Sequence, residues 1–358
     1  MSRILLIDVG AGTMDVLFHD MESGLQCKAV VRSPVLTVAE QITRTPGNLL
    51  IKGVEMGGGS LAAILRQRAL RDEVLISASA AMTLHHQEDR VRSWGIRVIP
   101  DAEADEFRPT AGFSVLTFAD LDRERLRSLF SCFGVPFEMD SVGVCAQDHG
   151  IPPPGSGHLD HRHRVFAEAL DRDPFPHALL FPHDEIPGTF HRLQSIARCA
   201  MNLPTPEAWV MDSGMAAILG ASMDSSARRA ERVLVLDAAT SHTVGAALDR
   251  GEITGFFEYH TRDVTLPRIE SLLEAVADGK LRHSRILEEG GHGAYIRKAL
   301  GFDRVQDIVA TGPRRRILDG SRLSIRFAAP GGDNMMTGNV GLLEAICRRK
   351  GLPSPQWI

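Results

Sequence analysis

The sequence predicts an α/β protein with a duplicated architecture, and two observations carry this prediction. Apolar stretches of strand length alternate with segments whose apolar residues recur at spacings of three and four, which favours a partly parallel sheet. A strand–turn–strand motif in residues 4–18 also has a counterpart of the same design in residues 233–248. Two such hairpins in one chain indicate two lobes of similar plan.

Between the hairpins, periodicity predicts further strands and helices. Continuous apolar runs predict strands, and charged residues spaced regularly among apolar ones predict helices. The predicted strands are residues 74–78, 141–145 and 178–181, and the predicted helices are residues 60–70, 121–133 and 163–170.

The first hairpin has the composition of a phosphate-binding turn. Gly10 and Gly12 let the backbone reach positive φ and approach a ligand closely, so that N–H donors are exposed. Asp8 and Asp15 could order a hydrated Mg²⁺, and Thr13 could bond a phosphate oxygen. The alternative is a hairpin whose turn uses Gly and Asp for shape alone, because short glycine motifs have many false positives.

The second hairpin repeats this design. An apolar strand ends at Asp237, a turn of small and hydroxyl residues follows, and another apolar strand completes the motif. Three further segments, residues 210–221, 308–313 and 338–346, carry small residues at positions suited to close packing.

The order of these segments resembles the actin, sugar-kinase and seventy-kilodalton heat-shock superfamily of ATP-binding proteins. That superfamily carries motifs called phosphate 1, connect 1, phosphate 2, adenosine and connect 2, in this order. The corresponding segments here are Asp8 to Asp15, Asp212 to Ala221, Asp237 to Leu248, Thr311 to Pro313, and Gly338 to Ile346. The resemblance implies a two-lobed actin-like ATPase fold, which is a duplicated ribonuclease H-like plan with a nucleotide cleft between the lobes.

The resemblance also implies domain boundaries. Residues 1–212 would form the first lobe with the phosphate 1 hairpin, and residues 213–334 the second lobe with the phosphate 2 and adenosine motifs. Residues 335–358 would form a C-terminal helix that returns towards the first lobe.

ATP and Mg²⁺ are the ligands that the resemblance implies. Asp8, Asp15 and Asp237 would serve the metal ion. The nucleotide would contact Gly10, Gly12, Thr13, Asp237, Thr240, Thr243, Thr311 and Gly312.

Two departures from the superfamily pattern bear on nucleotide affinity. Ala238 and Ala239 replace glycines of the second turn, and alanine restricts φ, which weighs against close phosphate approach. Pro313 replaces a glycine of the adenosine motif, so one N–H is lost and the turn is stiffer. Nucleotide affinity is therefore expected to be weak or altered.

Two further resemblances point to particular families within this superfamily. Residues 211–253 are similar to part of the hydantoinase A and oxoprolinase proteins, with Ser213-Gly214-Met215-Ala216 following their Ser-Gly-Pro-Ala pattern. The whole chain, especially Gln147-Asp148-His149-Gly150, is similar to a prokaryotic family labelled as pyruvate formate-lyase activating enzymes.

The cysteines do not fit that label. Activating enzymes hold an iron–sulfur cluster through closely spaced cysteines. No two of the five cysteines stand close enough for a cluster motif; they are Cys27, Cys132, Cys145, Cys199 and Cys347. A radical iron–sulfur enzyme is therefore not expected, and the scatter fits reduced thiols in a cytoplasmic protein better than a disulfide framework.

Composition supports a cytoplasmic expectation. The chain has 358 residues, of which 44% are hydrophobic and 24% charged, with no apolar run of membrane length and no leading signal peptide. A formal net charge of −5 provides no electrostatic reason to expect nucleic acid or an anionic membrane as a partner.

Gln147 and Asp148 join Asp8 as the catalytic candidates. With His149 they follow a predicted strand, where an open α/β sheet places ligand-binding residues. Either could orient water on a γ-phosphate, and Asp148 could instead take a proton from a substrate hydroxyl. The equally weighted alternative is that Asp148 starts a turn and His149 packs under the proline-rich loop of residues 151–157, which we expect to face the cleft.

A histidine-rich segment, residues 158–163, offers a further metal candidate. Its spacing matches no established zinc pattern. We expect instead a solvated loop of mixed charge that leads into a helix from His163.

Three function classes follow from these motifs. The slightly favoured one is a Mg²⁺-dependent ATPase that couples hydrolysis to lobe closure and to action on a partner, either a protein or a small molecule. The second is a small-molecule kinase or a hydantoinase-like ATP-dependent enzyme. The third is a nucleotide sensor without chemistry, which Ala238 and Ala239 make credible.

Overall fold

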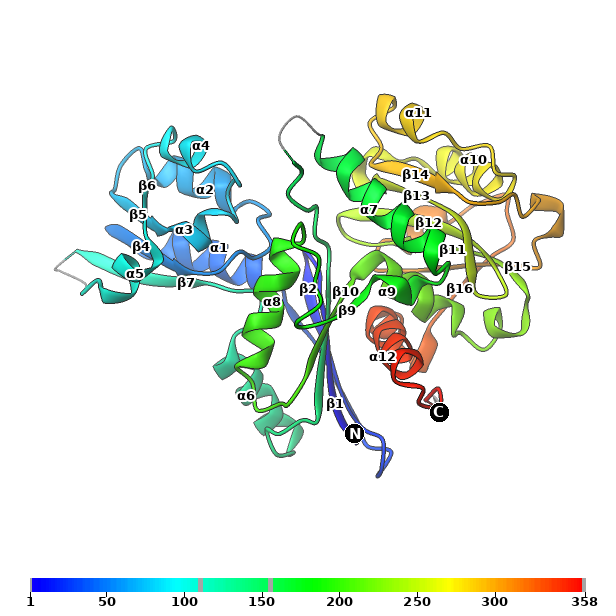
Figure 1. Ribbon diagram of the computed structural model, residues 1–358, viewed down its shortest axis with the longest axis horizontal. Coiled ribbons are helices and arrows are strands. Elements are labelled where there is room, and N and C mark those ends of the chain that lie inside the picture. The colour runs from blue at the N-terminus through cyan, green and yellow to red at the C-terminus, as the bar shows by residue number, and fades with distance from the viewer. Residues whose placement is uncertain (1, 109–111, 154–156, 356–358) are drawn as a thin grey trace.

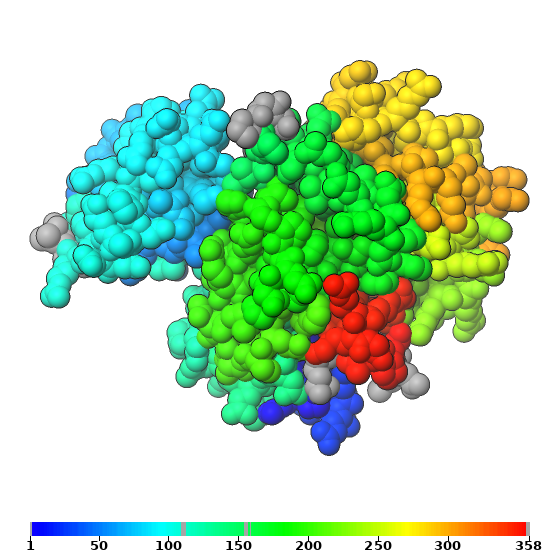
Figure 2. Space-filling model, in the orientation of Figure 1, coloured from blue at the N-terminus to red at the C-terminus, as the bar shows by residue number. Residues whose placement is uncertain are grey.

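The two hairpins of the sequence become the first strands of two separate sheets (Figure 1). The computed structural model describes residues 2–108, 112–153 and 157–355. It contains two lobes side by side and a third sheet, which forms a separate domain inserted into the first lobe. The space-filling view shows the inserted domain, in blue and cyan, projecting from one side of the first lobe, with the second lobe on the other side (Figure 2).

The first-lobe sheet has the strand order β3-β2-β1-β8-β10-β9. Its strands are β1 (Arg3–Val9), β2 (Thr13–Asp20), β3 (Gln26–Arg32), β8 (Ser141–Ala146), β9 (Leu180–Pro182) and β10 (Ala208–Asp212). The first three strands are antiparallel neighbours, and β8 and β10 continue the sheet parallel to β1. This register places Asp8 opposite Asp15 and beside Cys145.

The second-lobe sheet repeats that plan in the order β14-β13-β12-β11-β15-β16. Its strands are β11 (Arg232–Ala238), β12 (His242–Asp249), β13 (Glu252–His260), β14 (Gly293–Ile296), β15 (Asp307–Thr311) and β16 (Ile325–Phe327). The hairpin strands β11 and β12 are antiparallel, and β15 runs parallel to β11. Since both sheets extend a three-stranded antiparallel meander by parallel strands, the predicted two-lobed actin-like ATPase fold is confirmed.

The inserted domain was not expected from the sequence. Its parallel sheet has the order β6-β5-β4-β7 and its own hydrophobic core. The strands are β4 (Asn48–Gly53), β5 (Val74–Ser77), β6 (Arg97–Ile99) and β7 (Phe113–Phe118), and the helices are α1 (Pro34–Arg44), α2 (Leu61–Arg68), α3 (Ala78–Ala81), α4 (Glu88–Arg92) and α5 (Asp101–Glu106).

The remaining helices cover the two lobe sheets or join them. They are α6 (Arg123–Phe133), α7 (His158–Arg172), α8 (His191–Met201), α9 (Ser213–Ser222), α10 (Leu266–Ala277), α11 (His283–Glu288) and α12 (Thr337–Lys350). Short 3-10 turns are η1 (Pro176–Leu179), η2 (Ala227–Arg229), η3 (Thr261–Asp263), η4 (Phe302–Arg304), η5 (Arg315–Leu318), η6 (Pro330–Gly332) and η7 (Asn334–Met336). Within the described parts of the chain, no helix has the length and apolarity needed to cross a bilayer.

The expected loop at residues 158–163 is instead the first part of α7, and this prediction was wrong. Arg162 and His163 are buried, with exposed fractions of 2% and 5%. Arg162 forms ion pairs with Asp212 and Glu258, and the ring of His163 stacks on Phe256 at a centroid distance of 5.3 Å. Charge composition suggested solvent exposure, but partners from elsewhere in the chain bury Arg162 and His163, while Asp160 is exposed.

Helices α9 and α12 cross at two glycines, and this crossing joins the lobes. A Cβ atom on Gly220 would lie 1.9 Å from the carbonyl oxygen of Thr337, and one on Gly341 would lie 1.8 Å from that of Ala216. Helix α12 also packs against β1 and β8 of the first lobe, while α9 packs against β11 and β15 of the second. Only glycine permits this backbone approach.

Candidate functional site

The two hairpin turns border a cleft of about 1290 Å³ that is lined by both lobes and by the inserted domain. Every predicted site residue except Thr243 lines this cleft, namely Asp8, Gly10, Gly12, Thr13, Asp15, Gln147, Asp148, Asp237, Thr240, Thr311 and Gly312. Thr243 is fully buried in the second lobe, where its hydroxyl lies 3.0 Å from that of Thr261. Ile151, Pro152 and Pro153 of the predicted loop also line the cleft, whereas residues 154–156 lie outside the described residues.

The two turns meet at Gly12 and Thr240. A Cβ atom on Gly12 would lie 3.4 Å from Oγ1 of Thr240, so the tips of the two hairpins are direct neighbours. The expectation of positive φ at Gly10 and Gly12 was wrong, since neither residue has it. Gly10 donates its N–H to the carbonyl of Thr13 at 3.0 Å, and Ala239 makes the same bond to His242 at 3.0 Å. Alanine therefore closes the second turn without strain.

Three carboxylates lie at the base of the turns. Burial, followed by the negative charge of Asp237, raises the pKa of Asp8 to about 7. Burial and the charge of Asp8 raise the pKa of Asp15 to about 8, and burial raises the pKa of Asp237 to about 7. Among the described residues, Oδ1 of Asp15 is buried without a hydrogen-bond partner. Crowded, buried carboxylates are stabilised in their ionised forms by a cation, and hard oxygen donors fit Mg²⁺.

Two more glycines bring other elements close to these carboxylates. Gly312 has a φ of 91°, and a Cβ atom there would lie 2.4 Å from the carbonyl oxygen of Ala238. Gly338, at the start of α12, would place a Cβ atom 2.1 Å from Oδ2 of Asp8. Just before it, the hydroxyl of Thr337 lies 2.7 Å from that of Thr311, which is fully buried. The sequence placed Gly338 in a closing helix but did not reveal its position against Asp8.

Both carboxylate oxygens of Asp148 accept hydrogen bonds from backbone N–H groups. Its Oδ1 accepts the N–H of Gly150 at 2.8 Å, and its Oδ2 accepts the N–H of Leu193, in the first turn of α8, at 3.0 Å. Burial raises the pKa of this carboxyl group. The geometry fits the part of the alternative in which Asp148 starts a turn, and it adds a bond to the start of a helix; His149, by contrast, is exposed and lines the cleft.

Gln147 reaches across to the second lobe. Its Nε2 donates to Oε1 of Glu258 at 2.5 Å, and Glu258 is also paired with Arg162. Arg162 in turn donates to Asp212 at 3.0 Å and to the backbone oxygen of Asp148 at 3.1 Å. Sequence reasoning missed Glu258 and Arg162, although a glutamate within the apolar strand β13 was a signal that a buried partner exists.

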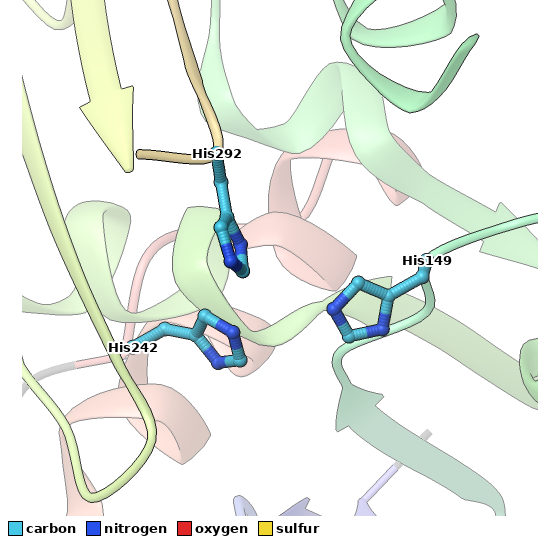
Figure 3. A group of neighbouring side chains, drawn as sticks. All are labelled: His149, His242 and His292. Atoms are coloured by element: carbon cyan, nitrogen blue, oxygen red, sulfur yellow. The ribbon is translucent and has the colours of Figure 1, made fainter. Parts of the chain in front are cut away.

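A cluster of histidines lies beside this network. The rings of His149, His242 and His292 converge, as Figure 3 shows, and one donor atom from each lies within 4.8 Å of those of the other two. Desolvation inside the cleft lowers the pKa of His149 to about 3 and that of His242 to about 4, so both rings are neutral at pH 7. His260 packs against His292 at a centroid distance of 4.3 Å. Sequence reasoning missed the cluster, because its members come from three distant segments.

The inserted domain contributes a polar wall to the same cleft. Oε1 of Glu55 lies 2.8 Å from Nε2 of His86, while its Oε2 is buried without a hydrogen-bond partner among the described residues. Arg192 of α8 makes a two-pronged ion pair with Asp120 at 2.8 and 3.1 Å. It also donates to the backbone oxygen of Gln147 at 2.7 Å, which links this wall to the residues facing the second lobe.

Solved structures with likeness to this chain share low sequence identity with it. The ethanolamine utilization protein EutJ from Carboxydothermus hydrogenoformans is 11% identical, over 96% of this chain and 89% of that one, with a TM-score of 0.37. A Bacteroides thetaiotaomicron protein with actin-like ATPase fold and unknown function is 9% identical, over 94% and 95%, with a TM-score of 0.37. A ROK hexokinase from Thermus thermophilus is 14% identical, over 98% and 99%, with a TM-score of 0.32. At such TM-scores, the fold assignment depends on the strand order described above.

The match to a sequence family is more specific than the similarity to these solved structures. A search of curated proteins found no match. Residues 56–317 match the family described as "Putative pyruvate format-lyase activating enzyme (DUF1786)", and this segment contains the second hairpin, the histidine cluster and most of the inserted domain. Because the match covers well over half of the chain, the protein belongs to this family.

Proposed function

We propose that the protein binds ATP with Mg²⁺ in the cleft and couples ATP hydrolysis to lobe closure, which acts on a partner. The observation that carries the proposal is the direct approach of the hairpin turns, Gly12 against Thr240, above the carboxylates of Asp8, Asp15 and Asp237. One turn from each lobe then faces the same phosphate chain. This arrangement serves phosphoryl chemistry, in which positioning and charge neutralisation are the main contributions of the protein.

The carboxylates and the turns have separate tasks in this proposal. The backbone N–H groups of the first turn and the hydroxyls of Thr13 and Thr240 would contact phosphate oxygens. Mg²⁺ keeps several of its waters in such sites, so Asp8, Asp15 and Asp237 would hold the ion largely through its water shell. When bound, the ion would neutralise phosphate charge.

Of the candidates near the reacting phosphate, Gln147 is better placed to orient water than Asp148. The Nε2 group of Gln147 donates to Glu258, so its carbonyl oxygen is the acceptor that could orient a water molecule. Asp148 uses both oxygens on backbone N–H groups, and we assign it the task of positioning Gln147 and the start of α8.

The positions of the cysteines do not support the activating-enzyme activity named in the family description. The five cysteines lie on five different elements, β3, α6, β8, α8 and α12. An iron–sulfur cluster of the activating type requires several thiolates on one short loop.

Titration calorimetry with Mg²⁺–ATP tests the proposal, with phosphate release followed on the same samples. Asp8→Asn should abolish measurable nucleotide binding, because the amide cannot hold the hydrated ion. The matched control is Asp184→Asn, an exposed aspartate outside the cleft, which should bind as the unaltered protein does. Binding by Asp8→Asn at full affinity would refute the assignment. Binding without phosphate release by the unaltered protein would instead favour a nucleotide sensor.

A small-molecule kinase is the second candidate, and Glu55 is the observation that favours it. Glu55 lines the cleft on the inserted domain, opposite the second lobe, where a hydroxyl acceptor could bind, and its Oε2 has no hydrogen-bond partner within the described part of the chain. A kinase predicts ATP consumption that depends on an added hydroxylated metabolite and falls in Glu55→Gln, whereas a hydrolase predicts phosphate release without any addition.

A further inference from the structure

The three converging histidines come from both lobes. His149 follows β8 in the first lobe, His242 begins β12, and His292 directly precedes β14 in the second lobe. Their donor atoms all lie within 4.8 Å of one another and point into a common space (Figure 3). His149 and His242 also line the cleft. The group is thus a bridge between lobes at one side of the proposed nucleotide site.

We propose that His149, His242 and His292 bind one divalent transition-metal ion, with Zn²⁺ as the ion of first choice. Imidazole nitrogen suits Zn²⁺, Ni²⁺, Cu²⁺ and Fe²⁺, whereas Mg²⁺ takes oxygen ligands. The site is therefore chemically separate from the carboxylates of the hairpins. Zn²⁺ binding by these histidines does not depend on whether the protein binds ATP.

The spacing of the rings is compatible with one ion after a small closure. Zn–N bonds of about 2.0–2.1 Å place the nitrogens of a tetrahedral site about 3.4 Å apart. In the structure the ligand atoms lie up to 4.8 Å apart. Rotation of the side chains, or a slight approach of the two lobes, would shorten these distances to the value that a bound ion requires. Because two ligands belong to one lobe and the third to the other, the ion would draw the lobes together.

The surroundings of the rings resemble those of metal-ligating histidines. Nε2 of His242 and Nδ1 of His292 are buried without a hydrogen-bond partner among the described residues. Nδ1 of His292 nevertheless lies 3.6 Å from Oε1 of Glu258. A ligating histidine usually gives its other N–H to a carboxylate, which fixes the ring and raises its basicity. Glu258 would perform that task and leave Nε2 of His292 for the ion.

The positive charge of Arg162, which lies near the histidines, does not prevent a cation from binding there. Arg162 is paired with both Glu258 and Asp212, so the histidines do not face an uncompensated guanidinium group. Three protein ligands leave a fourth position open for water or for an anionic group, as in catalytic zinc sites. Since His149 and His242 line the cleft, that position is accessible to a ligand there.

The test uses the untagged full-length protein, stripped of metal by a chelator and free of nucleotide. Zn²⁺ titration calorimetry and Co²⁺ absorption spectroscopy should both give one equivalent per chain. His149→Gln and His242→Gln should each weaken binding by at least about 100-fold. His149 is exposed to the cleft, so its replacement leaves the fold intact, and thermal unfolding without metal verifies this.

Two controls make the outcome specific to the cluster. His183→Gln alters an exposed histidine that does not line the cleft and should bind Zn²⁺ like the unaltered protein. Asp8→Asn should also bind Zn²⁺ normally even where it loses Mg²⁺–ATP, which separates this proposal from the proposed function. Absence of stoichiometric Zn²⁺ binding, or equal binding by His149→Gln and His242→Gln, would overturn the proposal.

Discussion

The two lobe sheets share one plan but carry different chemistry. In each, an apolar first strand brings an aspartate, Asp8 or Asp237, to the base of a tight turn closed by the same backbone hydrogen bond. The residue opposite that aspartate on the second strand differs, because Asp15 faces Asp8 whereas Val244 faces Asp237. The first hairpin is therefore the more acidic of the two.

The second lobe has a different set of donors near its hairpin. His242 begins β12, and Glu258 and His292 lie on or beside the neighbouring strands β13 and β14. The repeated backbone plan thus positions one aspartate from each lobe, while the second lobe adds the imidazole nitrogens of His242 and His292 near its hairpin. A cleft between such lobes can hold a hard cation and a softer one in separate places.

The crossing of α9 and α12 joins the two lobes, and disrupting it should have the largest effect on the stability of the protein. Gly341→Ala places a methyl group 1.8 Å from a backbone oxygen of α9, which neither helix can avoid without moving apart. We expect a loss of stability on the order of 3 kcal/mol, as for severe overpacking. The urea midpoint measures it.

Gly188→Ala is the matched control, because a methyl group at this position would have no heavy atom within 4 Å and Gly188 has no positive φ. Its urea midpoint should hardly change. An unchanged midpoint in Gly341→Ala would show that the two helices do not cross at this short distance.

The next largest effect should be on Mg²⁺–ATP affinity, when a substitution makes the first hairpin less acidic. Asp15→Asn keeps the size of the side chain but removes one of three crowded carboxyl groups, and the second hairpin likewise has no carboxyl group at the equivalent position, Val244. We expect Mg²⁺–ATP affinity to fall on the order of 10-fold while Zn²⁺ binding is retained. Calorimetry with each ligand measures both, and a loss of Zn²⁺ binding as well would contradict the separation of the two sites.

The acidic base of the hairpins also predicts a pH dependence. The carboxyl pKa values of Asp8, Asp15 and Asp237 are higher in the folded protein than the unfolded value near 4, so folding takes up protons. The free energy of unfolding of the metal-free protein should therefore fall as pH rises towards about 8. Buried neutral histidines act in the opposite direction, but only below their unfolded pKa of about 6.5.

Urea unfolding between pH 6.5 and 8.5 measures the aspartate contribution together with that of His86, whose pKa is raised by its hydrogen bond to Glu55, and the Asp15→Asn variant separates the two. The midpoint of the metal-free protein should decrease across this window, and excess Mg²⁺ should flatten the decrease because it stabilises the ionised carboxylates. Asp15→Asn should show a shallower slope without Mg²⁺. A midpoint that rises with pH would mean that these carboxyl groups are already ionised in the folded protein.

The hairpins were predictable from the sequence because each is local. Asp8, Gly12 and Thr13 stand within one short run, and the repeat at Asp237 signalled the duplication. The histidine cluster was not predictable, since residues 149, 242 and 292 meet only after the sheets form. The inserted domain escaped notice because its strands and helices have the same periodicity as those of the lobe that carries it.

The smallest expected effect concerns the turns themselves, where the sequence favoured glycine over alanine. Gly10 and Ala239 make the same turn hydrogen bond without positive φ, so Gly10→Ala should fold with a loss below about 1 kcal/mol. A methyl group there would meet the carbonyl oxygen of Thr13 at 3.2 Å, which asks only for a small shift. We expect Mg²⁺–ATP affinity to change by less than about threefold, measured by calorimetry. A much larger loss would show that the first turn needs a bare backbone against phosphate, and that the two turns are not interchangeable although the same hydrogen bond closes both.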